Sequence, residues 1–151
     1  MIYTPLTKKA LLLAWDAHLG QWDKSGLPYI FHPYHLAEQM EDELTCCAAL
    51  LHDVVEDTGW TLDALEMEGF PAPVLEALAL LTHDPVIPYL AYVRALSGNP
   101  IARAVKMADL RHNSDLTRLE VVTEKDKRRA EKYQKALALL EEAASGKSKT
   151  K

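Results

Sequence analysis

The amino-acid sequence predicts an all-α protein, folded as one irregular helical domain of about eight helices. Apolar residues recur at helical spacing along the chain, and no stretch alternates apolar with polar residues as strands do. The length of 151 residues and the hydrophobic fraction of 48% are typical of a single globular domain. The predicted helices differ greatly in length, which argues against a simple up-and-down bundle. We expect the domain to span residues 1–144 and the polar residues 145–151 to form a disordered tail.

The first part of the chain contains three predicted helices, over residues 7–19, 33–40 and 43–55. Thr7 is a candidate cap of the first helix, and Pro33 suits the first position of the second. The residues between these two helices are rich in Gly, Asp, Ser and Pro, which favour a loop. The third helix is the most apolar of the three, so we expect it to lie at the centre of the fold.

The second part of the chain contains five more predicted helices, over residues 61–69, 71–81, 89–96, 99–116 and 123–144. Gly69 is typical of a residue that closes a helix. Asn99 and Pro100 are typical of a helix start, and they predict the beginning of a long helix.

The composition excludes several classes of function. A net charge of −5 gives no basic surface for a nucleic acid, so we expect no nucleic-acid partner. No apolar run approaches the roughly 20 residues of a membrane span, and the first residues lack a secretory-signal pattern. Cys46 and Cys47 are adjacent and point about 100° apart on a helix, so a bridge between them would be strained. We expect both to be reduced and buried in a cytoplasmic protein.

Four ionisable residues lie among apolar neighbours: His32, the adjacent pair His52 and Asp53, and Asp109. Charged groups are seldom buried without partners. A metal ion would be a partner for all four, and two imidazoles with two carboxylates suit a divalent first-row ion. Such a site would tie three helices together and keep coordination positions for water and substrate oxygen.

Two further carboxylates accompany the His-Asp pair on its helix. Glu56 follows His52, and Asp57 follows Asp53, each four residues later and on the same side of the helix. A solvated acidic helix end would explain both carboxylates without any function. Acidic groups at a helix C-terminus oppose the helix dipole, however, and this mismatch favours a functional interpretation. Glu56 and Asp57 are then candidates to orient or deprotonate an attacking water.

Lys106, Asp109 and Asn113 share one face of the long helix, which brings a cation, a carboxylate and an amide together. An ordinary ion pair and a capping amide would explain the same spacing. The combined pattern suits hydrolysis of a phosphate ester, since a metal lowers the pKa of a bound water and polarises a phosphoryl group. Lys24, Lys106 and Arg111 are candidates to neutralise phosphate oxygens.

The remaining histidines and the tryptophans are interpreted as structural. No partner is evident in the sequence for His18, His35 or His83. The three tryptophans are expected to be core or rim residues rather than a platform for stacking bases; they are Trp15, Trp22 and Trp60.

The order of these motifs is more specific than any single motif. Segments 17–21, 24–33, 48–58 and 105–113 cover most of the first 117 residues. In this order they resemble the HD superfamily of metal-dependent phosphohydrolases, named for the adjacent His-Asp pair. Within it, the chain is similar to the hydrolase domain of RelA/SpoT-type alarmone enzymes and their small single-domain relatives. The resemblance implies an HD-type fold and hydrolysis without synthesis.

The resemblance also implies a reaction and a role for each matching residue. The reaction is removal of the 3′-pyrophosphate of (p)ppGpp, which gives GDP or GTP and pyrophosphate, and the usual metal of the family is Mn²⁺. The implied metal ligands are His32, His52, Asp53 and Asp109. Residues implied to position the hydrolytic water are Glu56 and Asp57. Implied nucleotide contacts are Lys24, Ser25 and Asn113, and more weakly Arg129 and Tyr133.

The chain departs from the family pattern at two positions. Alarmone hydrolases commonly carry a basic residue directly before Lys24, but here it is Asp23, which cannot make a cation–π contact with guanine and would repel phosphate if it turned inward. In the family motif Ala-Asp-Arg-Leu-His-Asn the Arg is moved by one position, to Arg111. Two alternatives therefore stay open: a hydrolase of another nucleotide or phosphomonoester, and a non-catalytic nucleotide or metal sensor. Intact Glu56 and Asp57 argue against the sensor, since binding alone would not need both.

Overall fold

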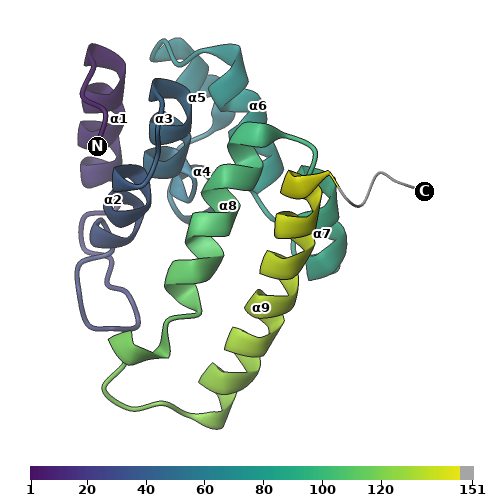
Figure 1. The fold of residues 1–151 in the computed structure, drawn as a ribbon. Coiled ribbons are helices and arrows are strands. Elements are labelled where there is room, and N and C mark those ends of the chain that lie inside the picture. Colours follow the sequence, from purple (N-terminus) through teal and green to yellow (C-terminus); the bar gives the residue numbers. More distant parts are fainter. Residues whose placement is uncertain (147–151) are drawn as a thin grey trace.

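The computed structural model describes residues 1–146, and these residues form an all-α fold, as predicted (Figure 1). They contain nine α-helices, one 3₁₀ helix and a single isolated β-bridge between Trp22 and Pro28. The helices are α1 (Pro5–Ala17), α2 (Phe31–Glu38), α3 (Glu43–Leu51), α4 (Val54–Asp57), α5 (Leu62–Met67), α6 (Ala72–Leu81), α7 (Tyr89–Leu96), α8 (Pro100–Asn113), η1 (Leu116–Arg118) and α9 (Glu124–Ser145).

Side-chain caps fix where most of the longer helices begin. The capping oxygen accepts a hydrogen bond from the backbone amide three residues later, in the first turn. Residues that cap in this way are Thr4, Asp42, Thr61, Asn99 and Thr123. The first helix therefore begins earlier than predicted, because Thr4 is its cap and Thr7 is the third residue of the capping box. The second also begins earlier, at Phe31 rather than Pro33.

The predicted helix 43–55 is wrong in one respect, because the chain breaks at His52 and Asp53. α3 ends at Leu51, and Asp53 has φ −104° and ψ 0°, away from ideal helical values. The His52 Nδ1–H donates to the Ala49 carbonyl oxygen at 2.7 Å, and residue 53 would use this acceptor in an uninterrupted helix. The break turns the His-Asp pair toward the cavity described below, while α4 continues from Val54.

Two other boundaries differ from the prediction. The long helix α8 ends at Asn113 rather than near residue 116, and the chain continues through η1 after the Ser114 amide bonds the Leu110 carbonyl. The last helix includes Ser145, which had been assigned to the disordered tail, and Gly146 closes it with φ +79°. The rest of that predicted tail, residues 147–151, lies outside the described residues.

The helix α3 lies at the centre of the fold, as its apolar sequence predicted. Every side chain from Thr45 to Leu51 is buried, and α3 packs against α1, α2, α6 and α8. Both Cys46 and Cys47 are free and fully buried in this core. α8 lies between α3 and α9 and packs against both of them (Figure 1). Across residues 1–146, no helix combines the length and apolar character needed to cross a membrane.

Candidate active site

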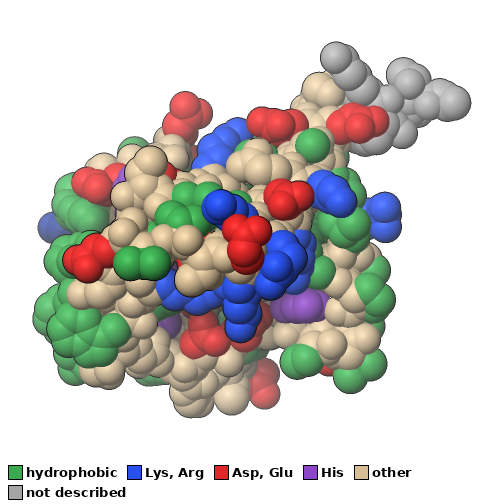
Figure 2. All heavy atoms as spheres, turned by 90° about the horizontal axis from the view of Figure 1, so that it is seen from below, with side chains coloured by type: hydrophobic (Ala, Val, Ile, Leu, Met, Phe, Trp, Pro, Cys, Tyr) green, Lys and Arg blue, Asp and Glu red, His purple; other side chains and the backbone are tan. Residues whose placement is uncertain are grey.

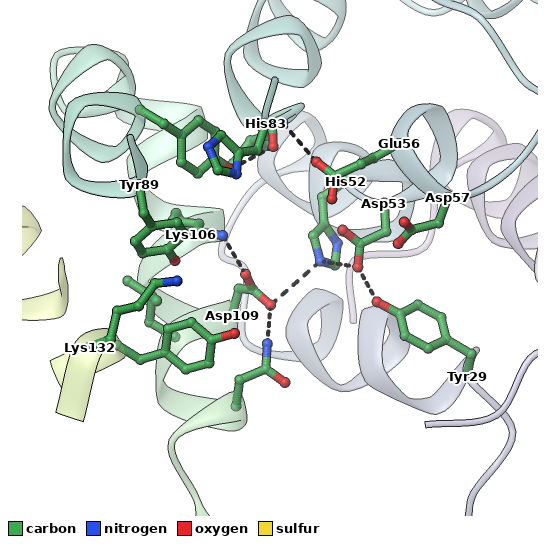
Figure 3. Close-up of a pocket in the computed structure, with 15 residues that line it drawn as sticks. Tyr29, His52, Asp53, Glu56, Asp57, His83, Tyr89, Lys106, Asp109 and Lys132 are labelled. Atoms are coloured by element: carbon green, nitrogen blue, oxygen red, sulfur yellow. Dashed lines mark hydrogen bonds and ion pairs between the residues drawn. The ribbon is translucent and has the colours of Figure 1, made fainter. Parts of the chain in front are cut away.

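A cavity of about 330 Å³ opens where α3, α4, α7, α8 and α9 meet (Figure 3). A second cavity, of about 350 Å³, lies on the side of the loop 20–28 and η1. The two cavities share Tyr29, Asn113 and Tyr133 as lining residues, so they are adjoining parts of one cleft. A single ligand can therefore extend from one cavity into the other.

Three of the four predicted metal ligands meet in one buried cluster. His32 from α2, His52 from the end of α3 and Asp109 from α8 each offer an atom within 4.8 Å of the others. His32 Nε2 lies 2.9 Å from Asp109 Oδ1, and His52 Nε2 lies 3.7 Å from the same oxygen. The relative exposure of these residues is only 3%, 4% and 6%. Residues far apart in sequence are thus gathered at one point, as the sequence predicted.

The fourth predicted ligand, Asp53, lies beside this cluster and also joins a second one. Its Oδ2 lies 3.0 Å from His52 Nε2, yet His52 Nε2 is a buried atom with no hydrogen bond of normal geometry. The Tyr29 hydroxyl donates to Asp53 Oδ2 and holds the carboxylate in place. Asp53, Glu56 and Asp57 also offer oxygens within 4.8 Å of one another.

The donor set of His32, His52, Asp53 and Asp109 fits a divalent first-row metal. The His52 Nδ1–H donates to the Ala49 carbonyl, which leaves the Nε2 lone pair for a cation. Burial disfavours the charged His52, but Asp53 and Asp109 outweigh it and raise the pKa of His52 well above its usual value. The surroundings of Nε2 therefore favour positive charge, which a metal ion would supply.

The imidazole of His32 also has a partner on its outer nitrogen. His32 Nδ1 lies 2.7 Å from His112 Nδ1, and the two rings are stacked with centroids 5.0 Å apart. Burial and the neighbouring His32 lower the pKa of His112 to about 4, so His112 is neutral and can accept the bond. A hydrogen bond of this kind orients a ligating imidazole and increases its basicity. His35 extends the stack, since its ring lies 4.4 Å from that of His112.

The carboxylates of Glu56 and Asp57 face the same cavity from α4 (Figure 3). Glu56 Oε1 accepts a hydrogen bond from the His83 backbone amide at 2.7 Å, which fixes its position across the cavity. Burial and the nearby Asp53 raise the pKa of Asp57 to about 6. A carboxylate with such a pKa is well placed to exchange a proton near neutral pH.

Lys106 forms the opposite wall with two tyrosines. Its ammonium lies 3.0 Å from Asp109 Oδ2, and it sits over the rings of Tyr89 and Tyr92, 5.6 and 5.3 Å from their centroids. Burial opposes its charge, but Asp109 outweighs it and raises the pKa of Lys106 well above its usual value. Asn113 Nδ2 donates to Asp109 Oδ1 at 2.8 Å. Asp109 thus accepts from both of the helix neighbours that share its predicted face.

The second cavity is lined by four of the five predicted nucleotide contacts, and Ser25 is not among its lining residues. Lys24, Asn113, Arg129 and Tyr133 all line it. Figure 2 shows Lys and Arg side chains gathered near the centre of the face that carries the loop 20–28, η1 and the start of α9. This local basic surface lies on a protein whose net charge is −5.

Asp23 does not face into the second cavity as a free anion. Its Oδ1 accepts hydrogen bonds from the backbone amides of Ser25 and Leu27 and from the Ser25 hydroxyl, at 2.8, 3.0 and 2.6 Å. Its Oδ2 lies 3.4 Å from Nη2 of Arg118, which also lines the cavity. These bonds outweigh burial and lower the pKa of Asp23. The predicted contact Ser25 therefore has its hydroxyl engaged with Asp23.

Several sequence interpretations require correction. Arg111 lies away from both cavities, where its Nη2 is 3.6 Å from Glu141, so it is not placed to neutralise phosphate there. His18 and His83 have partners after all: Gln21 for His18 Nδ1, and the Ile87 carbonyl for His83 Nε2. The prediction of core or rim tryptophans needs no such change, because Trp60 packs against the core and the exposed Trp22 lines the second cavity.

Five polar residues of the cavity were not identified from the sequence: Tyr29, His83, Tyr89, Tyr92 and Lys132. They come from the loop before α2, the turn before α7, α7 itself and α9. Tyr29 lies three residues before His32, within the segment 24–33 that carries the resemblance. The other four lie far in the sequence from every candidate metal ligand, so motif spacing carried no signal for them. The two tyrosines Tyr89 and Tyr92, three residues apart on one helix, were the only sequence feature that indicated an aromatic wall of the cavity.

No family model matches the chain. Comparison with individual proteins, however, finds similar sequences. Over 108 residues the chain is 39% identical to the human guanosine-3′,5′-bis(diphosphate) 3′-pyrophosphohydrolase MESH1, covering 64% of this chain and 60% of that protein. Over 63 residues it is 51% identical to the bifunctional (p)ppGpp synthase/hydrolase SpoT of Escherichia coli, covering 39% of this chain and 9% of that protein. The chain is therefore similar in sequence to two proteins that are named as (p)ppGpp hydrolases. The predicted resemblance is thus confirmed.

A solved structure shows the same fold. It belongs to a metazoan orthologue of SpoT that hydrolyses ppGpp, with a TM-score of 0.73 and 24% sequence identity, and the match covers 93% of this chain and 87% of that one. The chain therefore shares the all-α fold of that orthologue, as expected. The chain spans less than two thirds of the length of both curated relatives described above.

Proposed function

We propose that this protein is a metal-dependent hydrolase that removes the 3′-pyrophosphate of (p)ppGpp, releasing GDP or GTP and pyrophosphate. The observation that carries the proposal is the buried cluster of His32, His52 and Asp109, flanked by Asp53 and open to a cavity with two further carboxylates. The names of the relatives supply the substrate, because MESH1 and SpoT are both described as acting on (p)ppGpp.

The metal would be held by His32, His52, Asp53 and Asp109, and Mn²⁺ is the ion we propose, because it accepts a mixed nitrogen and oxygen donor set. When bound, such an ion supplies positive charge to the phosphoryl oxygens and lowers the pKa of a water. The protein's own part is to hold the four donors in place. Tyr29 orients Asp53, the Ala49 carbonyl orients His52, and Lys106 and Asn113 orient Asp109.

Asp57 would deprotonate the attacking water, and Glu56 would orient it. In the reaction, the water oxygen bonds to the phosphorus next to the ribose 3′ oxygen, and the bond from that phosphorus to the 3′ oxygen breaks. Asp57, whose pKa is about 6, would accept the proton that the water loses, and a solvent water would give a proton to the leaving 3′ oxygen. Glu56 is fixed by the His83 amide and would orient the water.

The nucleoside would occupy the second cavity. Lys24 and Arg129 line it and would face the nucleotide phosphates, and Asn113 lies between the two cavities, where it would contact the ribose side. Ser25 contributes mainly by shaping the loop, since Asp23 engages both its amide and its hydroxyl. We further propose a cytoplasmic location, which suits the two buried free thiols Cys46 and Cys47.

The test is a panel of phosphorylated nucleotides incubated with the purified protein, with and without Mn²⁺. We expect pyrophosphate release from ppGpp that depends on the metal and is lost in Asp53→Asn, with Asp63→Asn on the exposed face of α5 as the matched control. Release of orthophosphate alone, from simpler nucleotides, would instead support a phosphomonoesterase. Tight nucleotide binding without any turnover would support a sensor.

A further inference from the structure

Beyond the candidate metal cluster, the first cavity ends at two residues to which the proposed reaction gives no role. Tyr89 of α7 and Lys132 of α9 line this cavity but not the second one, and they lie across the cavity from Tyr29, which lines both (Figure 3). Lys132 Nζ lies over the Tyr89 ring, 4.4 Å from its centroid. The side chains of two separate helices therefore meet at this end of the cleft.

The charge of Lys132 is available to a ligand, whereas that of Lys106 is not. Lys106 is already paired with Asp109 at 3.0 Å. Lys132 forms no ion pair with any carboxylate of residues 1–146, and its side chain is exposed at the mouth of the cavity. A cation that rests on an aromatic face at an exposed site is held weakly and can move to an anion.

The hydroxyl of Tyr89 is a second unused donor. Its oxygen is buried and its proton has no acceptor within the described chain, since the nearby Lys106 ammonium can only donate to that oxygen. A buried hydroxyl proton without an acceptor is unfavourable, so a ligand oxygen at this point would be stabilised by it. Because Lys132 lies over the same ring, an anion drawn to its ammonium would lie close to Tyr89.

We propose that Lys132 and Tyr89 bind the distal phosphate of the pyrophosphoryl group. The inference rests on the proposed function, since a phosphorus held beside His52 and Asp53 with its nucleoside in the second cavity has its distal phosphate in the remaining direction. The distal phosphate carries more negative charge than the phosphate attached to the ribose. It would contact the Lys132 ammonium, which has no carboxylate partner in the described chain, and the Tyr89 hydroxyl. This subsite selects diphosphate groups over monophosphates.

The test measures equilibrium binding of pyrophosphate and of orthophosphate to the full chain, at matched free Mn²⁺, by titration calorimetry. Lys132→Ala should weaken pyrophosphate binding about 10-fold and change orthophosphate binding less than about 2-fold, since orthophosphate does not reach past the metal cluster. Tyr89→Phe keeps the ring and should weaken pyrophosphate binding by about 3-fold. Lys135→Ala, one turn later on α9 and outside this cavity, is the matched control and should change neither.

Two outcomes would overturn the subsite: an unchanged pyrophosphate affinity in Lys132→Ala, or an equal loss for both anions. Binding needs no turnover, so the two proposals fail separately. A protein that binds pyrophosphate through Lys132 but leaves ppGpp intact supports the subsite and refutes the proposed reaction. A protein that cleaves ppGpp with pyrophosphate affinity unaffected by Lys132→Ala refutes the subsite and leaves the reaction standing.

Discussion

The ion pair between Lys106 and Asp109 can be tested quantitatively in the metal-free protein, through its contribution to the free energy of unfolding. The two side chains are only 13% and 9% exposed, and 3.0 Å separates Nζ from Oδ2. Lys106→Met keeps the apolar stem against the tyrosines and removes the ammonium. Breaking a buried ion pair costs about 3–5 kcal/mol. Asp109 retains donors from His32 and Asn113, so we expect the lower end, about 3 kcal/mol, in the free energy of unfolding.

The assay is urea unfolding of the protein in chelator, with Asp109→Asn as a second background. In that background the carboxylate charge is gone, so Lys106→Met should cost only the contacts with the aromatic rings, about 1 kcal/mol. The expected coupling is therefore about 2 kcal/mol. Lys127→Met, which breaks the exposed pair with Glu124, should cost less than about 1 kcal/mol. An equal cost of Lys106→Met in both backgrounds would refute the reasoning, because the residue would then act through packing alone.

Three other predictions concern the metal and the proton. Tyr29→Phe removes the donor to Asp53 and should weaken Mn²⁺ binding about 10-fold in calorimetry while leaving the fold intact; undiminished affinity would contradict the orienting role. Since the raised pKa of Asp57, about 6, keeps it protonated at lower pH, kcat/KM should rise as pH increases through about 6 and then level. Asp57→Asn should lower kcat and abolish that rise, and a retained rise would assign it to another group. Mn²⁺ should increase the thermal stability of the wild type more than that of Asp53→Asn, as measured by calorimetric scans.

The parts of the fold that depend on local signals were predictable from the sequence. α7 has the predicted bounds because Pro88 precedes it and its apolar residues repeat at helical spacing. The caps Asn99 and Thr123 likewise mark helix starts through bonds made within one turn. The break at His52 was not predictable, because the apolar pattern continues through Val54 and Val55 and the break depends on a bond from the His52 ring.

The candidate metal site was predictable for a related reason. A buried histidine or carboxylate needs a partner, and its apolar neighbours in the sequence reveal that it is buried. His32, His52 and Asp109 could therefore be grouped before their positions were known. Lys132 could not be grouped with them, since it lies on a mostly polar, exposed helix surface and only tertiary packing brings it to Tyr89.

The sequence suggests that Asp23 hinders nucleotide recognition, because relatives commonly carry a basic residue there. The hydrogen bonds around Asp23 indicate instead that it orders the loop. Asp23→Arg would introduce the basic residue that relatives commonly carry, but it would also remove the acceptor of three hydrogen bonds within the loop. The present loop already places a guanidinium at the second cavity, because Asp23 lies 3.4 Å from Arg118 Nη2.

Three lost bonds of about 1 kcal/mol each outweigh one exposed cation–π contact of about 0.5–1 kcal/mol. We therefore expect Asp23→Arg to weaken nucleotide binding in calorimetry, by about 10-fold, without changing Mn²⁺ affinity. Arg118→Ala should weaken nucleotide binding in the same direction. A gain in ppGpp affinity for Asp23→Arg would show instead that the missing cation, and not the order of the loop, limits recognition of the base.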